Sequence, residues 1–364
     1  MTSSRGRSAQ NCLASMSLLT VAAVLAWCSP AWTQTPLAAD LEPSRVFQSQ
    51  SLTDDDDEPA ADISGIACMP GTETRLCMVI NDEDRAAQLV QIEANSLVGG
   101  SKVQLIGKKP SASTLGDEPQ DGGCSEGKAK FKDHDGEGVA FSAPYFYVVG
   151  SHGCSRHGNK LRASAFILAR VQVDTRGNPV AVDTTYRLAE VLRTAPHIGP
   201  FFAKDLNGAD GLNIEGIAVV GDQLVVGLRA PFIDGKAFLI SVGLAHLFST
   251  SSSIPPSDAR VIPLTLGPNM GVRDLAPISD GRLLLLAGPA QEQEDVPYGF
   301  FLVDRSSPAA PIFLASLKDI HHDHTRPKAE GVVLLGAERD ALRVLVVFDG
   351  LRGGGPREYS VLLR

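Results

Sequence analysis

Five similar segments of the chain carry charged or polar residues at matching positions. The clearest of them reads NIEGIAVV from Asn213 to Val220, with the charged residue at Glu215. The matching residues in the five segments are Ser64, Glu137, Glu215, Arg273 and Glu330. Carboxylates gathered at one place can bind a cation, exchange protons or pair with arginine. Their chemistry therefore depends on whether the fold brings these distant positions together.

The repetition of these segments predicts the fold. Each is followed by a second apolar run, which is typical of a β-hairpin. The positions equivalent to Gly216 lie 57 to 78 residues apart, which leaves room for four short strands and a loop. We therefore predict an all-β chain folded as a β-propeller. Five blades are favoured, and six or seven blades, a β-sandwich and a tandem of hairpins are the alternatives.

The last repeat predicts how the ring of blades closes. Its apolar runs allow only three strands, at 332–335, 342–348 and 359–363. An N-terminal strand at 45–48 can supply the fourth, and such closure removes exposed sheet edges. We expect residues 62–364 to form one propeller domain.

Composition limits the functional classes. The 364 residues are 43% hydrophobic, enough for a large core, and carry a formal net charge of −9. An acidic chain is a poor match for nucleic acid, which binds basic surfaces. We expect a monomer whose partner is a small molecule or a protein of the cell envelope. No run beyond the N-terminal region is long enough to span a bilayer.

The N-terminal region predicts export. Arg5 and Arg7 precede an apolar stretch at 18–27 and then several small residues, the pattern of a secretory signal peptide. We assign it to residues 1–31, with cleavage between 28 and 39, followed by an acidic linker at 32–61 that holds the closing strand. The mature chain is then expected in the periplasm or outside the cell.

The four cysteines that remain after cleavage are disulfide candidates. Cys68 and Cys77 flank one predicted hairpin, and Cys124 and Cys154 would then join a long loop to the end of a strand. Free buried thiols are the alternative.

The predicted fold gathers a set of polar residues at one face. In a propeller the first strand of each blade lines the central channel and the second runs antiparallel to it. The start of the first strand and the end of the second therefore meet at the channel mouth. The candidate ligand-binding residues there are Glu137, His152, Glu215, Arg229, Arg273, Glu330 and Asp349.

Three interpretations of this set remain open. The glutamates can pair with Arg229 and Arg273, since buried charges are normally paired. Alternatively, Glu137, Glu215 and Glu330 can hold a metal, for which Ca²⁺ suits the oxygen ligands. The same residues can also line a substrate pocket.

Several motifs together resemble a known family. The stretches HDGEGVAF, YFYVVGSHGCSR, GLNIEGIAVVGDQLVVGLRAP, VRDLAP, LAGPAQEQ and VVFDG are similar to an uncharacterised family of exported bacterial proteins. That family is catalogued as a domain of unknown function and is expected to form a β-propeller, and the resemblance runs from about Asp62 to the C-terminus. It implies no established activity. More remotely, the acidic repeat element is similar to one in phytase-like esterase propellers, which would place Glu137, Glu215 and Glu330 at a channel-mouth site, although Ser64 and Arg273 depart from that pattern.

These observations favour an exported propeller that binds a small ligand or a metal at the channel mouth. One alternative is a metal-assisted hydrolase of phosphoesters or esters, with His152 as a further ligand or base and Arg229 and Arg273 holding an anion. Another is a scaffold that holds a protein of the cell envelope. The chain has no G-x-S-x-G, P-loop or dinucleotide-binding signature, and whether it is an enzyme stays open.

Overall fold

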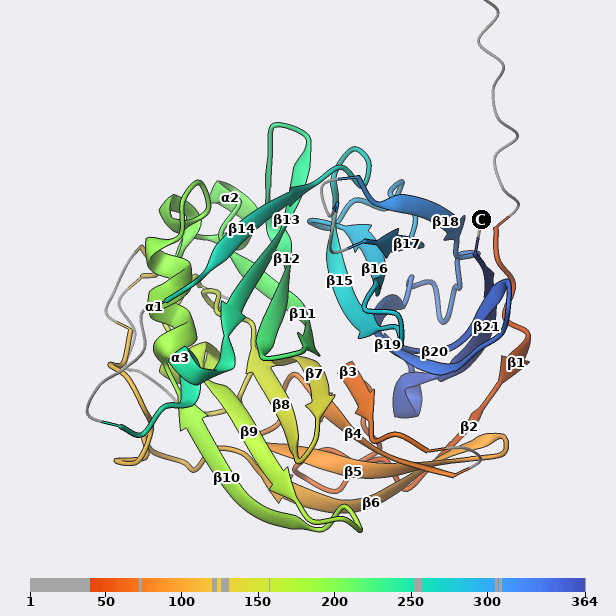
Figure 1. Cartoon of the computed structure of the whole chain (residues 1–364), viewed down its shortest axis with the longest axis horizontal. Helices are drawn as coiled ribbons and strands as arrows, with labels where there is room; N and C mark the ends of the chain where they lie inside the picture. Colours follow the sequence, from red (N-terminus) through yellow and green to blue (C-terminus); the bar gives the residue numbers. More distant parts are fainter. Residues whose placement is uncertain are drawn as a thin grey trace, which may run out of the picture. The chain divides into compact units, whose positions relative to one another are not determined.

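A computed structural model describes residues 40–363, apart from 72–73, 120–122, 126–130, 157, 252–256, 305–306 and 308–309. The signal peptide expected at 1–31 lies outside the described residues. The described residues form a five-bladed β-propeller, as predicted (Figure 1). No helix in the described part of the chain is long and apolar enough to cross a membrane.

Each blade is an antiparallel sheet whose first strand lies innermost. Blade one contains β3 (Ile63–Cys68), β4 (Arg75–Asn81), β5 (Ala86–Glu93) and β6 (Ser96–Gln104). Blade two contains β7 (Gly136–Ser142), β8 (Tyr145–Gly150), β9 (Leu168–Val173) and β10 (Pro179–Thr185). Blade three contains β11 (Asn213–Val220), β12 (Gln223–Ile233), β13 (Lys236–Gly243) and β14 (Arg260–Leu264). Blade four contains β15 (Met270–Pro277), β16 (Leu283–Pro289), β17 (Gly299–Val303) and β18 (Ile312–Ser316).

Blade five is closed by the N-terminal segment. It contains β19 (Lys328–Ala337), β20 (Ala341–Asp349) and β21 (Arg357–Leu362), and β1 (Arg45–Val46) pairs antiparallel with β21. The predicted closing strand is therefore confirmed. The chain then continues into β2 (Gln48–Gln50), which pairs parallel with β6 of blade one. One short segment thus joins the first and last blades and covers an edge of each.

Helices are few and lie between strands. α1 (Arg187–Thr194) and α3 (Leu244–Phe248) occupy the two places where apolar residues three and four apart indicate a helix. The remaining helices are α2 (Leu206–Ala209) and the 3₁₀ turns η1 (Ala163–Phe166), η2 (Gly199–Phe201) and η3 (Arg352–Gly354).

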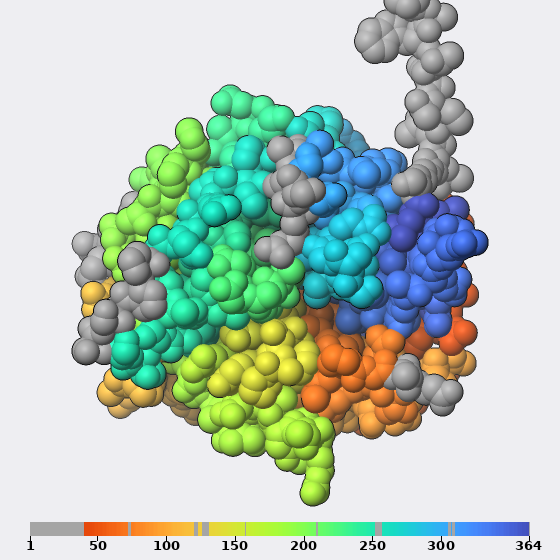
Figure 2. All heavy atoms as spheres, in the orientation of Figure 1, coloured from red at the N-terminus to blue at the C-terminus, as the bar shows by residue number. Residues whose placement is uncertain are grey.

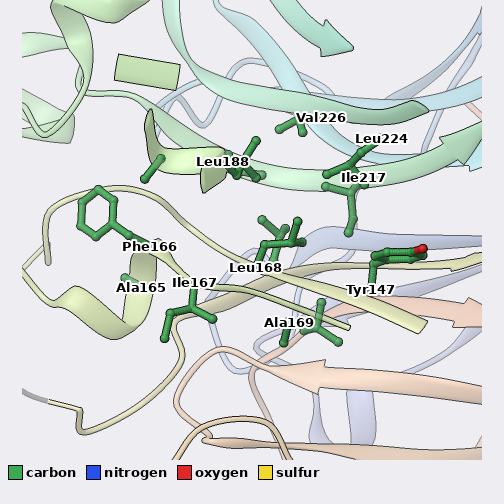
Figure 3. Close-up of a cluster of buried hydrophobic side chains, with 14 of the residues drawn as sticks. Tyr147, Ala165, Phe166, Ile167, Leu168, Ala169, Leu188, Ile217, Leu224 and Val226 are labelled. Carbon is green, nitrogen blue, oxygen red and sulfur yellow. The ribbon is translucent and has the colours of Figure 1, made fainter. Parts of the chain in front are cut away.

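The core lies between the faces of neighbouring blades. Figure 3 shows one part of it, where Tyr147 and Leu168 of blade two approach Ile217, Leu224 and Val226 of blade three. The last four of these side chains are completely buried, and burying each one stabilises the fold by roughly 1.5–3 kcal/mol. On the face seen in Figure 2, segments from all five blades meet around the centre.

Two disulfides form in the pairing expected from the sequence, Cys68–Cys77 and Cys124–Cys154. The first joins directly opposed residues of β3 and β4. Disulfides of this kind are typical of proteins outside the reducing cytoplasm.

Candidate functional site

The five matching polar residues are all bulge residues of the innermost strands. In each first strand the pairing with the second strand skips a position in the first half of the strand. The skipped residues are Ser64, Glu137, Glu215, Arg273 and Glu330. A bulge leaves its extra residue outside the ladder and changes the direction of its side chain. The same irregularity in all five blades therefore presents one polar side chain per blade near the channel.

The residue after each bulge lets the blades approach closely. We call these five residues the glycine ring, since four of them are glycines and the fifth is an aspartate: Gly65, Gly138, Gly216, Asp274 and Gly331. A Cβ added to Gly65 would lie 3.0 Å from the Cα of Gly138, and one added to Gly138 would lie 3.1 Å from the Cα of Gly216. The backbones of neighbouring blades are thus in contact here. This contact brings residues far apart in the sequence together around one axis.

Two arginines pair with two of the glutamates. Nη1 of Arg229 donates to Oε1 of Glu215 at 2.9 Å, and Nη2 of Arg273 lies 3.6 Å from Oε2 of the same carboxylate. Arg273 also donates directly to Glu330. All four side chains are almost fully buried. The pairing interpretation of the sequence therefore describes Glu215 and Glu330.

Glu137 lies beside these pairs but differs from them. Single carboxylate oxygens of Glu137, Glu215 and Glu330 all lie within 4.8 Å of one another. Glu137 is buried, with only 6% of its surface exposed. Nevertheless, no positively charged side chain of the described residues lies within ion-pair distance of its carboxylate. Arg156 lies on a loop near Glu137, and both residues line the same cavity. Desolvation opposes the charged form of Arg156, but the negative charges of Glu137, Glu215 and Glu330 outweigh this effect and raise its pKa.

The surroundings shift the pKa values of the three carboxyl groups in different directions. Burial, followed by the negative charge of Glu215, raises the pKa of Glu137 well above its usual range. Burial has the same effect on Glu215, but Arg273 and Arg229 outweigh it and hold the pKa below its ordinary value. Burial and the neighbouring Asp349 raise the pKa of Glu330 to about 7, against the opposing effect of Arg273. The three neighbouring carboxyl groups thus differ in how readily they lose a proton, and Glu215 loses its proton most readily.

A small acidic cavity opens above Glu137. Its volume is about 240 Å³, and its lining includes Asp82, Asp135, Glu137 and Arg156. Burial, followed by the charge of Asp135, raises the pKa of Asp82 to about 9. Burial also raises the pKa of Asp135, which accepts a hydrogen bond from Ser151. We call this cavity and the three glutamates the polar mouth.

The remaining predicted residues lie at different distances from this group. Asp349 pairs with Lys328, its directly opposed neighbour, and lies close enough to Glu330 to affect its pKa. The structure does not bring His152 to the carboxylates. Its ring packs 5.8 Å from that of Phe166, and its Nδ1 is 2.8 Å from the carbonyl oxygen of Gly150. Burial lowers the pKa of His152 to about 4, which is typical of a neutral core histidine.

Sequence reasoning did not select Asp82, Asp135, Lys328 or Arg156. The first three lie directly beside the strand ends from which the other candidates were taken. That position is a usable signal, since the fold gathers those ends at one face. Arg156 lies on a loop after Cys154, where no pattern in the sequence indicates a role.

The raised pKa of Asp82 predicts how stability changes with pH. A carboxyl whose pKa is near 4 when unfolded and about 9 when folded stabilises the protein fully below pH 4, and this contribution is lost as the pH rises toward 9. Asp82→Asn should therefore be more stable than the wild type at pH 8, by about 2 kcal/mol after allowance for solvent screening, and nearly equal to it at pH 5. Urea unfolding at both pH values measures the difference.

The matched control for this prediction is Asp340→Asn, which changes an exposed carboxyl on the β19–β20 turn. Its stability should follow that of the wild type at both pH values. If Asp82→Asn gains no more at pH 8 than at pH 5, the carboxyl of Asp82 is not protonated in the folded protein.

Comparisons with solved structures find chains of low sequence identity and low structural similarity. No curated protein matches the sequence. Among solved structures, a protein from Lactobacillus plantarum is 14% identical, with 90% of this chain and 72% of that chain covered and a TM-score of 0.32. The GDP-Man-dependent mannosyltransferase MPT-1 from Leishmania mexicana is 11% identical, with 90% and 91% covered and a TM-score of 0.39. The α-L-arabinofuranosidase PaAbf62A from Podospora anserina is also 11% identical, with 90% and 98% covered and a TM-score of 0.36. Similarity at this level identifies no shared activity.

A family profile gives a more direct assignment. It matches residues 176–357, half of the chain, and covers blade three, blade four and most of blade five. The matched part contains Glu215, Arg229, Arg273 and Glu330, whereas Glu137 lies before it. By this match the chain belongs to the family described as "Protein of unknown function (DUF3616)".

Proposed function

We propose that this protein is an exported binding protein whose polar mouth holds a divalent cation, Ca²⁺, as part of a site for a small polar ligand. The observation that supports it best is the group of oxygens from Glu137, Glu215 and Glu330 within 4.8 Å of one another. An ion bound at the 2.3–2.6 Å typical of Ca²⁺ would separate its ligand oxygens by up to about 5 Å. The three residues come from three different blades, so the fold itself sets this spacing.

The charge at the site also favours a cation. Arg229 and Arg273 pair with Glu215 and Glu330, while Glu137 has no such partner among the described residues. Asp82 and Asp135 add further carboxyl groups on the outer side. Oxygen-only ligands are those that Ca²⁺ prefers. A bound cation would stabilise the ionised form of Glu137 and offer its open positions to hydroxyl or carboxylate oxygens of a ligand in the cavity.

The alternatives receive less support from the described residues. A metal-assisted hydrolase would use His152 as a ligand or base, but the ring of His152 packs against Phe166. Arg229 and Arg273, the expected anion holders, are buried in ion pairs. An envelope scaffold requires an exposed interaction surface, and the exposed apolar side chains of the described residues, such as Val180, Ile312 and Phe313, lie on the outer strands β10 and β18 and not at the polar mouth. Binding is therefore the function that the geometry supports best.

Calcium titration of the protein after dialysis against EDTA tests the proposal. We expect saturable heat of binding at pH 8 and a rise in melting temperature, since a ligand of the folded state stabilises it. Glu137→Gln should lower the Ca²⁺ affinity at least tenfold. Because glutamine has almost the same shape as glutamate, this variant should melt within roughly 2 °C of the ion-free wild type.

Glu338→Gln is the matched control, because that side chain is exposed just after β19. It should bind Ca²⁺ as the wild type does. A wild-type protein that gives neither heat nor a shift in melting temperature with millimolar Ca²⁺ contradicts the proposal. So does a Glu137→Gln variant with unchanged affinity.

Export is the second part of the proposal. It is supported by the two disulfides and by the signal-peptide pattern at 1–31. Fractionation of cells that express the full chain should place it in the periplasm or the medium, shortened at its N-terminus. Recovery of the unshortened chain from the cytoplasm contradicts this part alone.

A further inference from the structure

The far end of the channel is an apolar cavity of about 380 Å³. All five innermost strands line it, each with the residue that directly follows the glycine ring. These residues are Ile66, Val139, Ile217, Leu275 and Val332. Its volume falls in the range of small-molecule sites, which are about 300–1,000 Å³. This end of the axis therefore has the size and lining of a ligand pocket, in contrast to the acidic mouth.

The glycine ring separates the two ends of the axis. The polar mouth is lined by residues before the ring, such as Glu137, and the apolar cavity by residues after it, such as Val139. Between them the backbones of neighbouring blades are in contact, as at Gly138 and Gly216. The apolar cavity is therefore a distinct site and does not continue the polar mouth.

One charged residue, Arg75, lines the apolar cavity. Nη1 of Arg75 donates to the carbonyl oxygen of Leu334 at 2.7 Å, and Nη2 donates to that of Leu335. These bonds hold the guanidinium at the wall of the cavity but leave its charge uncompensated. Burial, followed by the charge of Arg343, lowers the pKa of Arg75, and no carboxylate of the described residues lies within ion-pair distance. A cation held beside an apolar hollow favours an anion with an apolar body.

We propose that this cavity binds an amphipathic anion of the fatty-acid type, with its alkyl chain in the cavity and its carboxylate at Arg75. The five ring-adjacent side chains supply the apolar contact, and the free N–H groups of Arg75 supply the donors. The site is independent of the polar mouth, and its ligand differs in chemistry from the cation proposed there.

Calorimetric titration of the full chain with octanoate, decanoate and decanol tests the proposal. Decanoate should bind more tightly than octanoate by about three- to fourfold per added methylene, the gain expected for burying alkyl groups. Decanol should bind at least tenfold more weakly than decanoate. Arg75→Gln should reduce decanoate affinity to that of decanol and leave decanol unchanged.

Two further variants test the location. Ala276→Phe fills the cavity from β15 and should weaken binding of both ligands at least tenfold. Because Ala276 is buried and this variant can fail to fold, Ser279→Trp, at an exposed lining residue, provides a second way to obstruct the cavity. Arg260→Gln, an exposed arginine on the outer strand β14, is the control and should bind like the wild type.

The proposal is overturned if the wild type binds neither ligand, or if neither Arg75→Gln nor the obstructing variants change decanoate binding. Equal affinities for decanoate and decanol would disprove the role of Arg75 as the anion partner. Calcium binding is unaffected by these outcomes, since Glu137 lies on the other side of the glycine ring.

Discussion

Gly216→Ala is expected to lower the free energy of unfolding by about 3 kcal/mol or more, the upper range for overpacked sites. A Cβ at this position would lie 2.4 Å from the Cα of Asp274 and 2.9 Å from its Oδ1. The first of these contacts is with backbone, so no side-chain rotation can relieve it. Blades three and four would have to separate at the glycine ring. Urea unfolding measures the loss, and the same displacement should weaken Ca²⁺ binding because Glu215 and Arg273 precede the two residues in contact.

Gly336→Ala is the matched control for this prediction. Gly336 also lies in an innermost strand, β19, but an added Cβ there meets no atom within 4 Å. Its effect should stay within about 0.5 kcal/mol of zero, as for surface substitutions. Equal losses in the two variants would show that the contact between blades does not stabilise the fold.

The repeat made the architecture predictable. Apolar hairpins at regular spacing indicate where each blade begins, and the three-strand last repeat indicates that an N-terminal strand closes the ring; β19, β20, β21 and β1 confirm this. The strand β2 was not predicted. Its residues, Gln48–Gln50, are polar, and an edge strand of three polar residues carries no apolar pattern.

The site was predictable only as far as strand ends determine it. The start of the first strand of a blade lies beside the end of the second, which predicts a contact between Glu215 and Arg229. In the structure, Nη1 of Arg229 lies 2.9 Å from Oε1 of Glu215. The bulges were not predicted, because a skipped position can be identified only when the register of the two strands is known. A glycine inside an apolar run, such as Gly216, is the signal that could have revealed them.

His152 shows why adjacency to a strand end is insufficient. His152 lies two residues after the end of β8, and Arg229 lies near the end of the part of β12 that pairs with β11. The sequence pattern therefore does not distinguish the two. The backbone of His152 has a φ of 53°, in the left-handed region, which the sequence does not indicate for a non-glycine residue. Its ring lies against Phe166 as a result of this local conformation and the bond to Gly150.

Arg273→Met is expected to destabilise the protein by about 3–5 kcal/mol at pH 7, the cost of removing one partner from a buried ion pair. Arg273 contacts both Glu330 and Glu215, and its side chain is 1% exposed. Without it, Glu330 is left among carboxyl groups, and its folded pKa should rise above the present value of about 7. A carboxyl whose folded pKa is raised contributes stability at low pH and loses it as the pH rises. The deficit should therefore be smaller at pH 5 than at pH 8.

Two comparison variants separate this effect from a general loss of charge. Arg282→Met removes an exposed pair with Asp280 and should cost less than about 1 kcal/mol. Adding Glu330→Gln to Arg273→Met removes the unpaired charge and should recover at least half of the lost stability, because an ion pair replaced by neutral groups is often nearly neutral in effect. Urea unfolding at pH 5 and pH 8 measures all three variants. If Arg273→Met costs no more than Arg282→Met, or if the double variant recovers nothing, Arg273 does not act by compensating the buried carboxylates.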